Sequence, residues 1–447
     1  MKKGFYTIMA AQFFSSLADN ALLIAAMALL LQTHAPAWMT PLLKLFFVLS
    51  YVVLAAFVGA FADSMPKGRV MFITNTIKLF GCGMMLVGSH PLLAYAVVGF
   101  GAAAYSPPKY GILTELLPPE RLVAANGWIE GLTIASIILG TVLGGKLISH
   151  DVATFLLDLD VPILGDYIDT PPEAAMGVIM GLYVVAALFN LRIPDTGAVY
   201  PHQERRVVNL VTDFAECFVI LWRDRLGQIS LAVTTLFWGA GATLQFIVLK
   251  WAEHSLGMNL SQGAILQAIV AVGVAAGAII AAARIPLKKS LDVLPFGVAM
   301  GILVMAMAMA MAFFDRSYVP DVVFTIGRMH VPLYMIIAYA FLMLVGAMSG
   351  YFVVPMNALL QHRGHVLLSA GHSIAVQNFN ENLSVLIMLS MYALLVRFEV
   401  PVGLVIVLFG AFVCGTMWMV MRRHAANQRE FDSLFLIGEP KRADNKY

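Results

Sequence analysis

The sequence has few charged residues for its length. Of 447 residues, 12% are Asp, Glu, Lys or Arg and 60% are hydrophobic, and the mean hydropathy is +0.84. A soluble domain carries roughly 25% charged residues, which cover its water-exposed surface. The scarcity of charge therefore excludes an ordinary cytosolic enzyme and a disordered chain, and it indicates a polytopic membrane protein.

Cysteine is also scarce. Cys82, Cys217 and Cys414 lie far apart and form no C-x-x-C pair, so the sequence offers neither a disulfide framework nor a thiolate metal centre. His362 and His365 lack a third ligand at suitable spacing, and there is no P-loop. We therefore expect no catalytic residues, no metal or other cofactor and no nucleic-acid partner.

Long apolar runs are present instead of charge. A bilayer core of about 30 Å is crossed by roughly 20 helical residues. The sequence predicts twelve transmembrane helices and an all-α polytopic membrane protein. The predicted spans are approximately 5–31, 42–62, 70–88, 91–113, 125–148, 174–193, 228–250, 263–283, 293–313, 331–354, 370–396 and 400–421.

The distribution of basic residues predicts the orientation. With the N-terminus inside, inner segments hold 20 of the 28 Lys and Arg residues, whereas the outer loops hold only Arg316, Arg328 and Arg397. The outer loop 149–173 has six acidic residues and no basic one. Because basic residues are enriched in cytoplasmic loops, both termini are predicted to be cytoplasmic.

The longest inner connection divides the spans six and six. We expect an N-terminal half over 1–193, a cytoplasmic linker over 194–227, a C-terminal half over 228–421 and a cytoplasmic tail over 422–447. Within the linker, apolar residues recur at helical spacing from Val207 to Trp222, which favours an amphipathic surface helix over a plain linker.

Polar motifs recur at corresponding positions in the two halves. The fourth span ends in Tyr105–Gly111 and the fifth opens with Asn126–Glu130, whereas the tenth ends in Phe352–Asn357 and the eleventh contains Gln377–Glu381. Such repetition is typical of transporters that hold their substrate between two halves near the middle of the membrane.

The turn between the second and third spans carries a sharper motif. The stretch from Gly59 to Arg69 resembles the G-x-x-x-D-(x)-G-R signature of the major facilitator superfamily, at the position where that family carries it. The resemblance implies the major facilitator fold of two pseudo-symmetric six-helix halves. It also implies that Asp63, Lys67, Gly68 and Arg69 hold the cytoplasmic gate; a generic basic turn is the alternative.

Ionisable residues within the spans need a cavity or a partner, because burying charge in a bilayer is costly. Asp19 lies near the middle of the first span, on a face that either lines a water-filled path or fixes helix packing. Lys109 and Glu130 are expected near the inner ends of their spans, either in a salt bridge across the gate or in contact with substrate. Lys78 is expected in a structural ion pair.

Longer motifs resemble bacterial lysophospholipid transporters of the major facilitator superfamily. They occur in both halves, at 12–23, 101–113, 125–130, 236–244, 352–361 and 375–382. The resemblance implies a flippase, not an enzyme, that moves lysophospholipids, chiefly lysophosphatidylethanolamine, from the outer to the inner leaflet of the bacterial inner membrane by alternating access. An acyltransferase/acyl-carrier-protein synthetase acting in trans would re-acylate them, and we expect a monomer.

Two positions depart from this family pattern, because Gln245 replaces an arginine and Ala124 replaces a lysine. Lys250, in the same span as Gln245, is a substitute cation for phosphate. Asp19 and Glu381 suit an ammonium group, and Lys109 or Lys250 with the amides suits a phosphate. The expected substrate-binding residues are Asp19, Asn20, Lys109, Asn126, Glu130, Gln245, Lys250, Asn357, Gln377, Asn378 and Glu381.

Two other functions compete with this one. A proton-coupled drug or siderophore exporter would use Asp19, Glu130 or Glu381 as the proton carrier. Exporters of that type carry G-P-x-x-G-G in the fifth span, and Thr141 stands here in place of the proline, which disfavours the exporter. A non-transporting scaffold is disfavoured by the buried acids.

Overall fold

The computed structural model describes residues 3–35, 39–158, 167–198, 206–258, 260–313, 323–326 and 329–438. Nearly all of this part is helical. The first eight helices are α1 (Lys3–Gln32), α2 (Met39–Val53), α3 (Ala55–Ala62), α4 (Lys67–Leu86), α5 (Pro91–Leu116), α6 (Leu122–Leu147), α7 (His150–Leu157) and α8 (Pro171–Leu191). The others are α9 (Val207–Arg223), α10 (Gly227–Leu256), α11 (Leu260–Arg284), α12 (Leu294–Phe313), α13 (Leu333–Leu367), α14 (Ala370–Arg397) and α15 (Val402–Glu430).

Short elements connect the long helices. They are the 3₁₀ turns η1 (Pro119–Arg121), η3 (Leu287–Val293) and η4 (Ser433–Leu436), and the antiparallel strands β1 (Val323–Ile326) and β2 (Met329–Pro332). The hairpin and α7 were not predicted, and α13 runs well past the predicted end of the tenth span at residue 354.

The predicted twelve-helix architecture agrees with the composition of the helices. In the described ranges, nine helices are long and apolar enough to cross a membrane, and α2 with α3 forms a tenth span that is bent by 66°. Helices α4 and α5 are as long but more polar, because α4 carries Lys67, Arg69 and Lys78 and α5 carries Pro107 and Pro108. Lys67, Lys78, Pro107 and Pro108 are buried inside the protein, whereas Arg69 is exposed.

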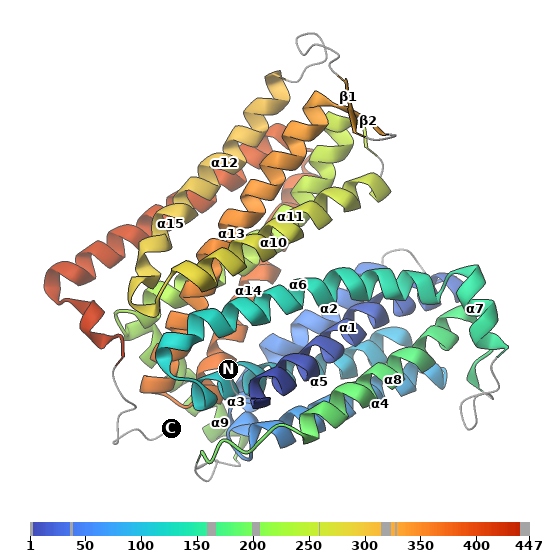
Figure 1. Cartoon of the computed structure of the whole chain (residues 1–447), viewed down its shortest axis with the longest axis horizontal. Coiled ribbons are helices and arrows are strands. Elements are labelled where there is room, and N and C mark those ends of the chain that lie inside the picture. Colours follow the sequence, from blue (N-terminus) through green and yellow to red (C-terminus); the bar gives the residue numbers. More distant parts are fainter. Residues whose placement is uncertain are drawn as a thin grey trace.

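The spans form two bundles, α1–α8 and α10–α15, which meet at one end and diverge toward the other (Figure 1). The N-terminus, α3 and α9 lie where the bundles meet, which we call the closed end. Helix α7 and the β-hairpin lie at the other end, which we call the open end. Between the bundles, α6 packs on α11, and α14 packs on α3 and α5.

Glycines set the closest helix contacts within each bundle. A side chain at Gly277 of α11 would collide with the backbone of Ala347 in α13, and one at Gly140 of α6 would lie 2.7 Å from the carbonyl oxygen of Leu17 in α1. Both glycines belong to G-x-x-x-G pairs, Gly273–Gly277 and Gly140–Gly144, and such pairs are typical of close helix contacts in membranes. Each bundle is therefore held as a compact unit.

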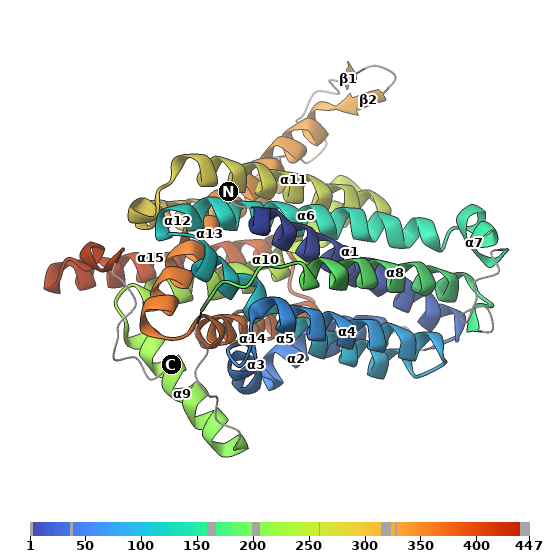
Figure 2. The ribbon, with the colours of Figure 1, turned by 60° about the horizontal axis from the view of Figure 1, so that its bottom comes forward.

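Helix α9 occupies the linker between the bundles. Its buried residues Cys217 and Leu221 pack against the closed ends of α10, α13 and α14, and it also contacts α3. The start of α9 projects from the bundles (Figure 2), and Val208 and Val211 there are exposed. An exposed apolar stripe on such a helix is typical of a segment that lies against a membrane surface.

Candidate functional site

Four residues from three helices meet where the two bundles join, and we call them the central cluster: Glu130, Asn357, Gln377 and Glu381. The Asn357 amide in α13 donates to Glu130 in α6 at 3.3 Å. Gln377 in α14 donates to Asn357 at 3.1 Å and to Glu381 at 2.7 Å. All four are at least 93% buried. Two carboxylates therefore lie between the bundles, where an amide donates to each of them and the Thr234 hydroxyl also bonds Glu381.

Two further polar pairs join the bundles beside the central cluster. Asn126 of α6 and Gln361 of α13 each donate to the other at 2.8 Å, because carboxamides carry both a donor and an acceptor. Asn378 of α14 donates to Ser106 of α5 at 2.9 Å. The interface is thus lined by side chains that can exchange partners without leaving a charge unpaired.

Lys109 of α5 is a cation whose charge interacts with Glu130 and Glu381 of the central cluster. It follows Pro107 and Pro108 in α5, and its ammonium lies 4.2 Å from the ring centroid of Tyr110. Among the described residues no carboxylate lies within 4.0 Å of it, so the salt bridge with Glu130 is not formed. Its strongest charge interaction is nevertheless with Glu130. The ammonium is therefore available to an anion.

Asp19 is engaged within the N-terminal bundle. Lys78 of α4 lies 2.7 Å from one of its carboxylate oxygens, and the Tyr183 hydroxyl of α8 donates to the other at 2.7 Å. Lys78 also donates to Ser15, one turn away from Asp19. The expectation that Lys78 forms a structural pair is confirmed, and its partner is the acid that the sequence assigned to substrate.

Three other expected binding residues lie away from the central cluster. Asn20 donates to the carbonyl of Ser16 in its own helix. Gln245 is exposed on α10. Lys250 pairs with Glu253 at 2.9 Å near the open end of α10. Thr234 of α10 lies beside Glu381, and sixteen residues of helix separate it from Lys250, or about 24 Å.

The predicted gate motif holds the closed end together. Asp63 accepts the backbone N–H groups of Gly371 at 3.0 Å and His372 at 3.1 Å, at the start of α14 in the other bundle. Lys67 lies 2.5 Å from Asp63, and the Ser369 hydroxyl also donates to it. The first N–H groups of a helix form a ready anion site. We call Asp63, Lys67, Ser369, Gly371 and His372 the Asp63 cluster.

Charge keeps the Asp63 carboxylate ionised. Burial by itself raises the pKa of this carboxyl group, but the ammonium of Lys67 and hydrogen bonds from His372 and Lys67 outweigh burial and hold the pKa well below its usual range. Gly371 has no room for a side chain, because a Cβ there would meet the carboxylate. Asp63 is thus a permanent anion held by the other bundle.

The rest of the gate motif plays different parts. Gly68 lets α4 approach α8, because a Cβ there would lie 3.1 Å from the carbonyl oxygen of Asn190. Arg69 is exposed and does not join the Asp63 cluster. Sequence reasoning missed Ser369 and His372, although a serine directly before a long helix is a common N-cap signal.

A second ion pair fixes the closed end of the C-terminal bundle. Arg363 of α13 is buried and bonds Asp224 through two nitrogens, at 2.7 and 3.1 Å. Its third nitrogen donates to the carbonyl of Leu436 in η4. Asp224 directly follows α9 in the linker, and Leu436 lies in the tail segment. Arg363 therefore bonds both segments. No sequence motif pointed to this pair.

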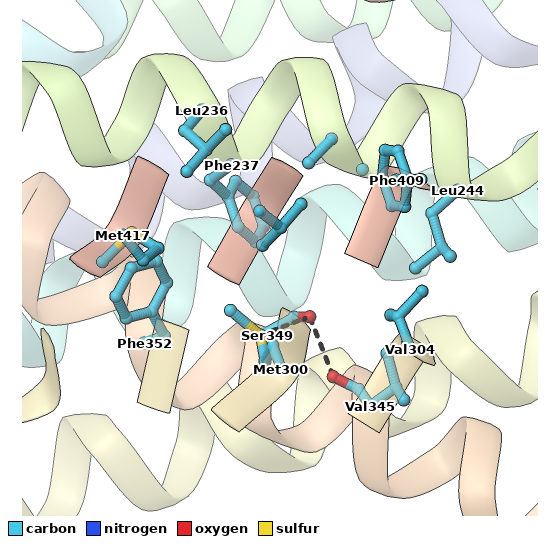
Figure 3. A pocket seen from close by; sticks show the side chains of 13 residues that line it. Leu236, Phe237, Leu244, Met300, Val304, Val345, Ser349, Phe352, Phe409 and Met417 are labelled. Carbon is cyan, nitrogen blue, oxygen red and sulfur yellow. Dashed lines mark hydrogen bonds between the residues drawn. The ribbon is translucent and has the colours of Figure 1, made fainter. Parts of the chain in front are cut away.

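An apolar cavity of about 60 Å³ lies inside the C-terminal bundle, among α10, α12, α13 and α15 (Figure 3). Phe237, Met300 and Phe352 contribute to its wall. The only polar side chain in the wall is Ser349, which donates to Val345 and to the sulfur of Met300. Phe352 is five residues from Asn357 on α13, so this apolar wall adjoins the central cluster.

Comparison with known proteins identifies the class and then the nearer relatives. The Major Facilitator Superfamily family model matches residues 8–388, and the chain belongs to that superfamily. Proteins named lysophospholipid transporter LplT are similar along nearly the whole chain. The Shigella boydii protein is 40% identical over 94% of this chain and 97% of its own length, and the Yersinia enterocolitica protein is 40% identical over 90% and 89%.

Solved structures share the fold at low sequence identity. A bacterial homologue of the iron transporter ferroportin in an outward-facing state has a TM-score of 0.68 at 12% identity, covering 96% of this chain and all of that one. The Escherichia coli fucose:proton symporter FucP has a TM-score of 0.67 at 12% identity, covering 94% and 98%. The chain therefore shares the fold of these multi-pass membrane proteins.

Proposed function

We propose that this protein moves lysophospholipids, chiefly lysophosphatidylethanolamine, from the outer to the inner leaflet of the bacterial inner membrane. The names of its relatives support this substrate class. The central observation is the central cluster itself, where two carboxylates face amides between the bundles and the unpaired Lys109 lies nearby. Such a set complements a head group with both charges.

Each part of the lipid has a matching group. The phosphate binds Lys109, because a lysine ammonium is a common point-charge ligand of phosphate. The ethanolamine ammonium binds Glu130 and Glu381, with Asn357 and Gln377 donating to the remaining oxygens. The acyl chain lies against the apolar walls of α10 and α13, of which Phe352 is closest to the cluster along the chain.

Transport proceeds by alternating access of the two bundles. The closed end faces the cytoplasm, as the distribution of Lys and Arg supports, and both termini lie there. Opening that end breaks the Asp63 cluster and the Asn126–Gln361 and Ser106–Asn378 pairs. The lipid is then delivered to a separate acyltransferase/acyl-carrier-protein synthetase, which re-acylates the lipid in trans. The transporter itself acts as a monomer.

Uptake of head-group-labelled lysophosphatidylethanolamine into spheroplasts tests this function. We expect Lys109→Gln to lose most uptake and Lys109→Arg to keep part of it, because arginine retains the charge. Lys288→Gln, at an exposed position at the closed end, is the matched control and should transport normally. Absence of lysolipid uptake by the folded wild-type protein would overturn the proposal.

The same assay separates the flippase from a proton-coupled exporter. If Glu130 or Glu381 serves only as a proton carrier, collapse of the proton gradient should stop transport and lysolipids should not compete with the exported compound. For the proposed function, lysolipid uptake should fall when Glu381 is replaced by Gln, more for the ethanolamine lipid than for the glycerol lipid.

A further inference from the structure

We propose a second lipid site at the open end, in the groove between α10 and α14, where Lys250 and Glu253 recognise the zwitterionic head group before it reaches the central cluster. This inference rests on the proposed function and adds a first binding step to it. The occupant is a lysophospholipid that arrives from the outer leaflet.

The groove has the size and lining of a lipid site. Its volume is about 790 Å³, and small-molecule sites commonly measure about 300–1,000 Å³. Apolar side chains from both helices line most of it, among them Phe246, Leu249, Leu389 and Val396. Lys250 and Glu253 are its only charged lining residues, so an acyl chain and a charged head group have separate places.

Aromatic side chains join the two walls of the groove. The rings of Phe246 and Tyr392 lie with their centroids 6.1 Å apart, and the Tyr392 hydroxyl is 3.5 Å from the backbone oxygen of Phe246. A pair of rings at this separation offers a flat apolar surface beside the charged pair. Such a surface suits the glycerol backbone and the first methylenes of a lipid.

The ion pair contributes little to the stability of α10. The side chains of Lys250 and Glu253 are 51% and 66% exposed, and exposed pairs contribute only about 0–1 kcal/mol. Lysine also precedes glutamate here, which is the less favourable order on a helix. Glu253 lies three residues before the C-terminus of α10 at Leu256, where the helix dipole disfavours an acid.

Charge complementarity explains what the pair can bind. The Lys250 ammonium and a Glu253 oxygen are 2.9 Å apart, so a cation and an anion are presented side by side with no net charge. A phosphate next to an ammonium can replace each partner of this pair with the opposite group of the lipid. An anionic lipid matches only Lys250 and meets repulsion from Glu253.

The outer groove and the central cluster lie on the same two helices. Tyr392 follows Glu381 by eleven residues of α14, or about 16 Å, and Lys250 follows Thr234 by about 24 Å along α10. A lipid bound in the groove therefore approaches the central cluster by moving along one helix pair. In this proposal Lys250 binds the lipid first, in the groove, and Lys109 binds it later, at the central cluster.

The test compares two lipids in single-charge variants. Initial uptake rates are measured against concentration for lysophosphatidylethanolamine, which is zwitterionic, and lysophosphatidylglycerol, which is anionic. Glu253→Gln should raise KM for the ethanolamine lipid and lower it for the glycerol lipid, each by about 2- to 5-fold, as expected for an exposed charge pair. Lys250→Gln should raise KM for both, and kcat should change little.

Two further variants make the outcome decisive. The swap of Lys250→Glu with Glu253→Lys keeps both charges and should restore the lipid preference, whereas Ala393→Trp fills the exposed groove and should raise KM for both lipids. Lys288→Gln is again the control. If wild type transports both lipids and their KM ratio is the same in every variant, the outer site is wrong while the proposed function stands.

Discussion

At the scale of single residues, the partner of a buried charge decides its role. Asp19 sits near the middle of α1, yet Lys78 and Tyr183 occupy both of its carboxylate oxygens. Glu381, in the first half of α14, instead has the Gln377 amide and the Thr234 hydroxyl as partners. Of these two acids, therefore, Glu381 is the one available to a cationic head group.

Replacing Asp19 should damage folding rather than lipid preference. Asp19→Asn leaves Lys78 buried without its partner, and breaking a buried ion pair costs about 3–5 kcal/mol. We expect a lower melting temperature in detergent and a similar loss of uptake for ethanolamine and glycerol lysolipids. The double change Asp19→Leu with Lys78→Met removes both charges and should recover most of the stability. A loss of uptake confined to the ethanolamine lipid would contradict this structural role and indicate that Asp19 binds the substrate.

The sequence motifs identified the residues of the candidate site, but they did not show which of these residues contact one another. Glu130, Asn357, Gln377 and Glu381 were all expected to bind substrate, because polar side chains stand out in apolar spans. Which of them touch depends on helix rotation, which the sequence does not encode locally. The Asp19–Lys78 pair and the distance of Lys250 from the cluster follow from helix packing and could not be predicted from spacing.

At the scale of elements, the contact between Asp63 and the start of α14 joins the two bundles at the closed end. The carboxylate receives two backbone N–H groups, and Gly371 leaves room for it.

The membrane spans were predictable from the sequence, because long apolar runs identify them. The bend at Leu54, the long α13 and the β-hairpin were not, because they depend on contacts outside the apolar runs.

A side chain at Gly371 should weaken closure. In Gly371→Ala the new methyl group collides with the Asp63 carboxylate, and such overpacking costs about 1–3 kcal/mol. We expect the closed end to open more often, measured as faster labelling of a cysteine placed at Ser369. Gly415→Ala in α15 is the matched control, because a Cβ there meets nothing within 4 Å. Equal labelling of both variants would contradict the role of this contact.

At the scale of the whole molecule, the two bundles act as units joined by exchangeable polar contacts. The glycine contacts hold α11 against α13 inside one bundle, whereas Ser106–Asn378 and Asn126–Gln361 join one bundle to the other. Movement is therefore expected at the interface and not within the bundles, since interface polar groups can exchange partners while close-packed backbones cannot separate cheaply.

A covalent link across this interface should stop transport reversibly. In Ser106→Cys with Asn378→Cys, the thiols replace groups that are 2.9 Å apart, so oxidation should join α5 to α14. We expect uptake to cease on oxidation and to return after reduction. Either single cysteine variant serves as the control, and it should be insensitive to oxidant. Continued uptake by the cross-linked protein would mean that this interface need not separate.

The described contacts at the closed end are made between groups of the chain itself. Asp63 is satisfied by Lys67 and the start of α14, and the acids of the central cluster are held by amides of the chain itself. For the proposed function, these contacts allow the empty protein to close this end without a second substrate. The proposed transporter is thus suited to net flux of lipid down its gradient, in contrast to an obligatory exchanger, whose empty form changes state only after a counter-substrate binds.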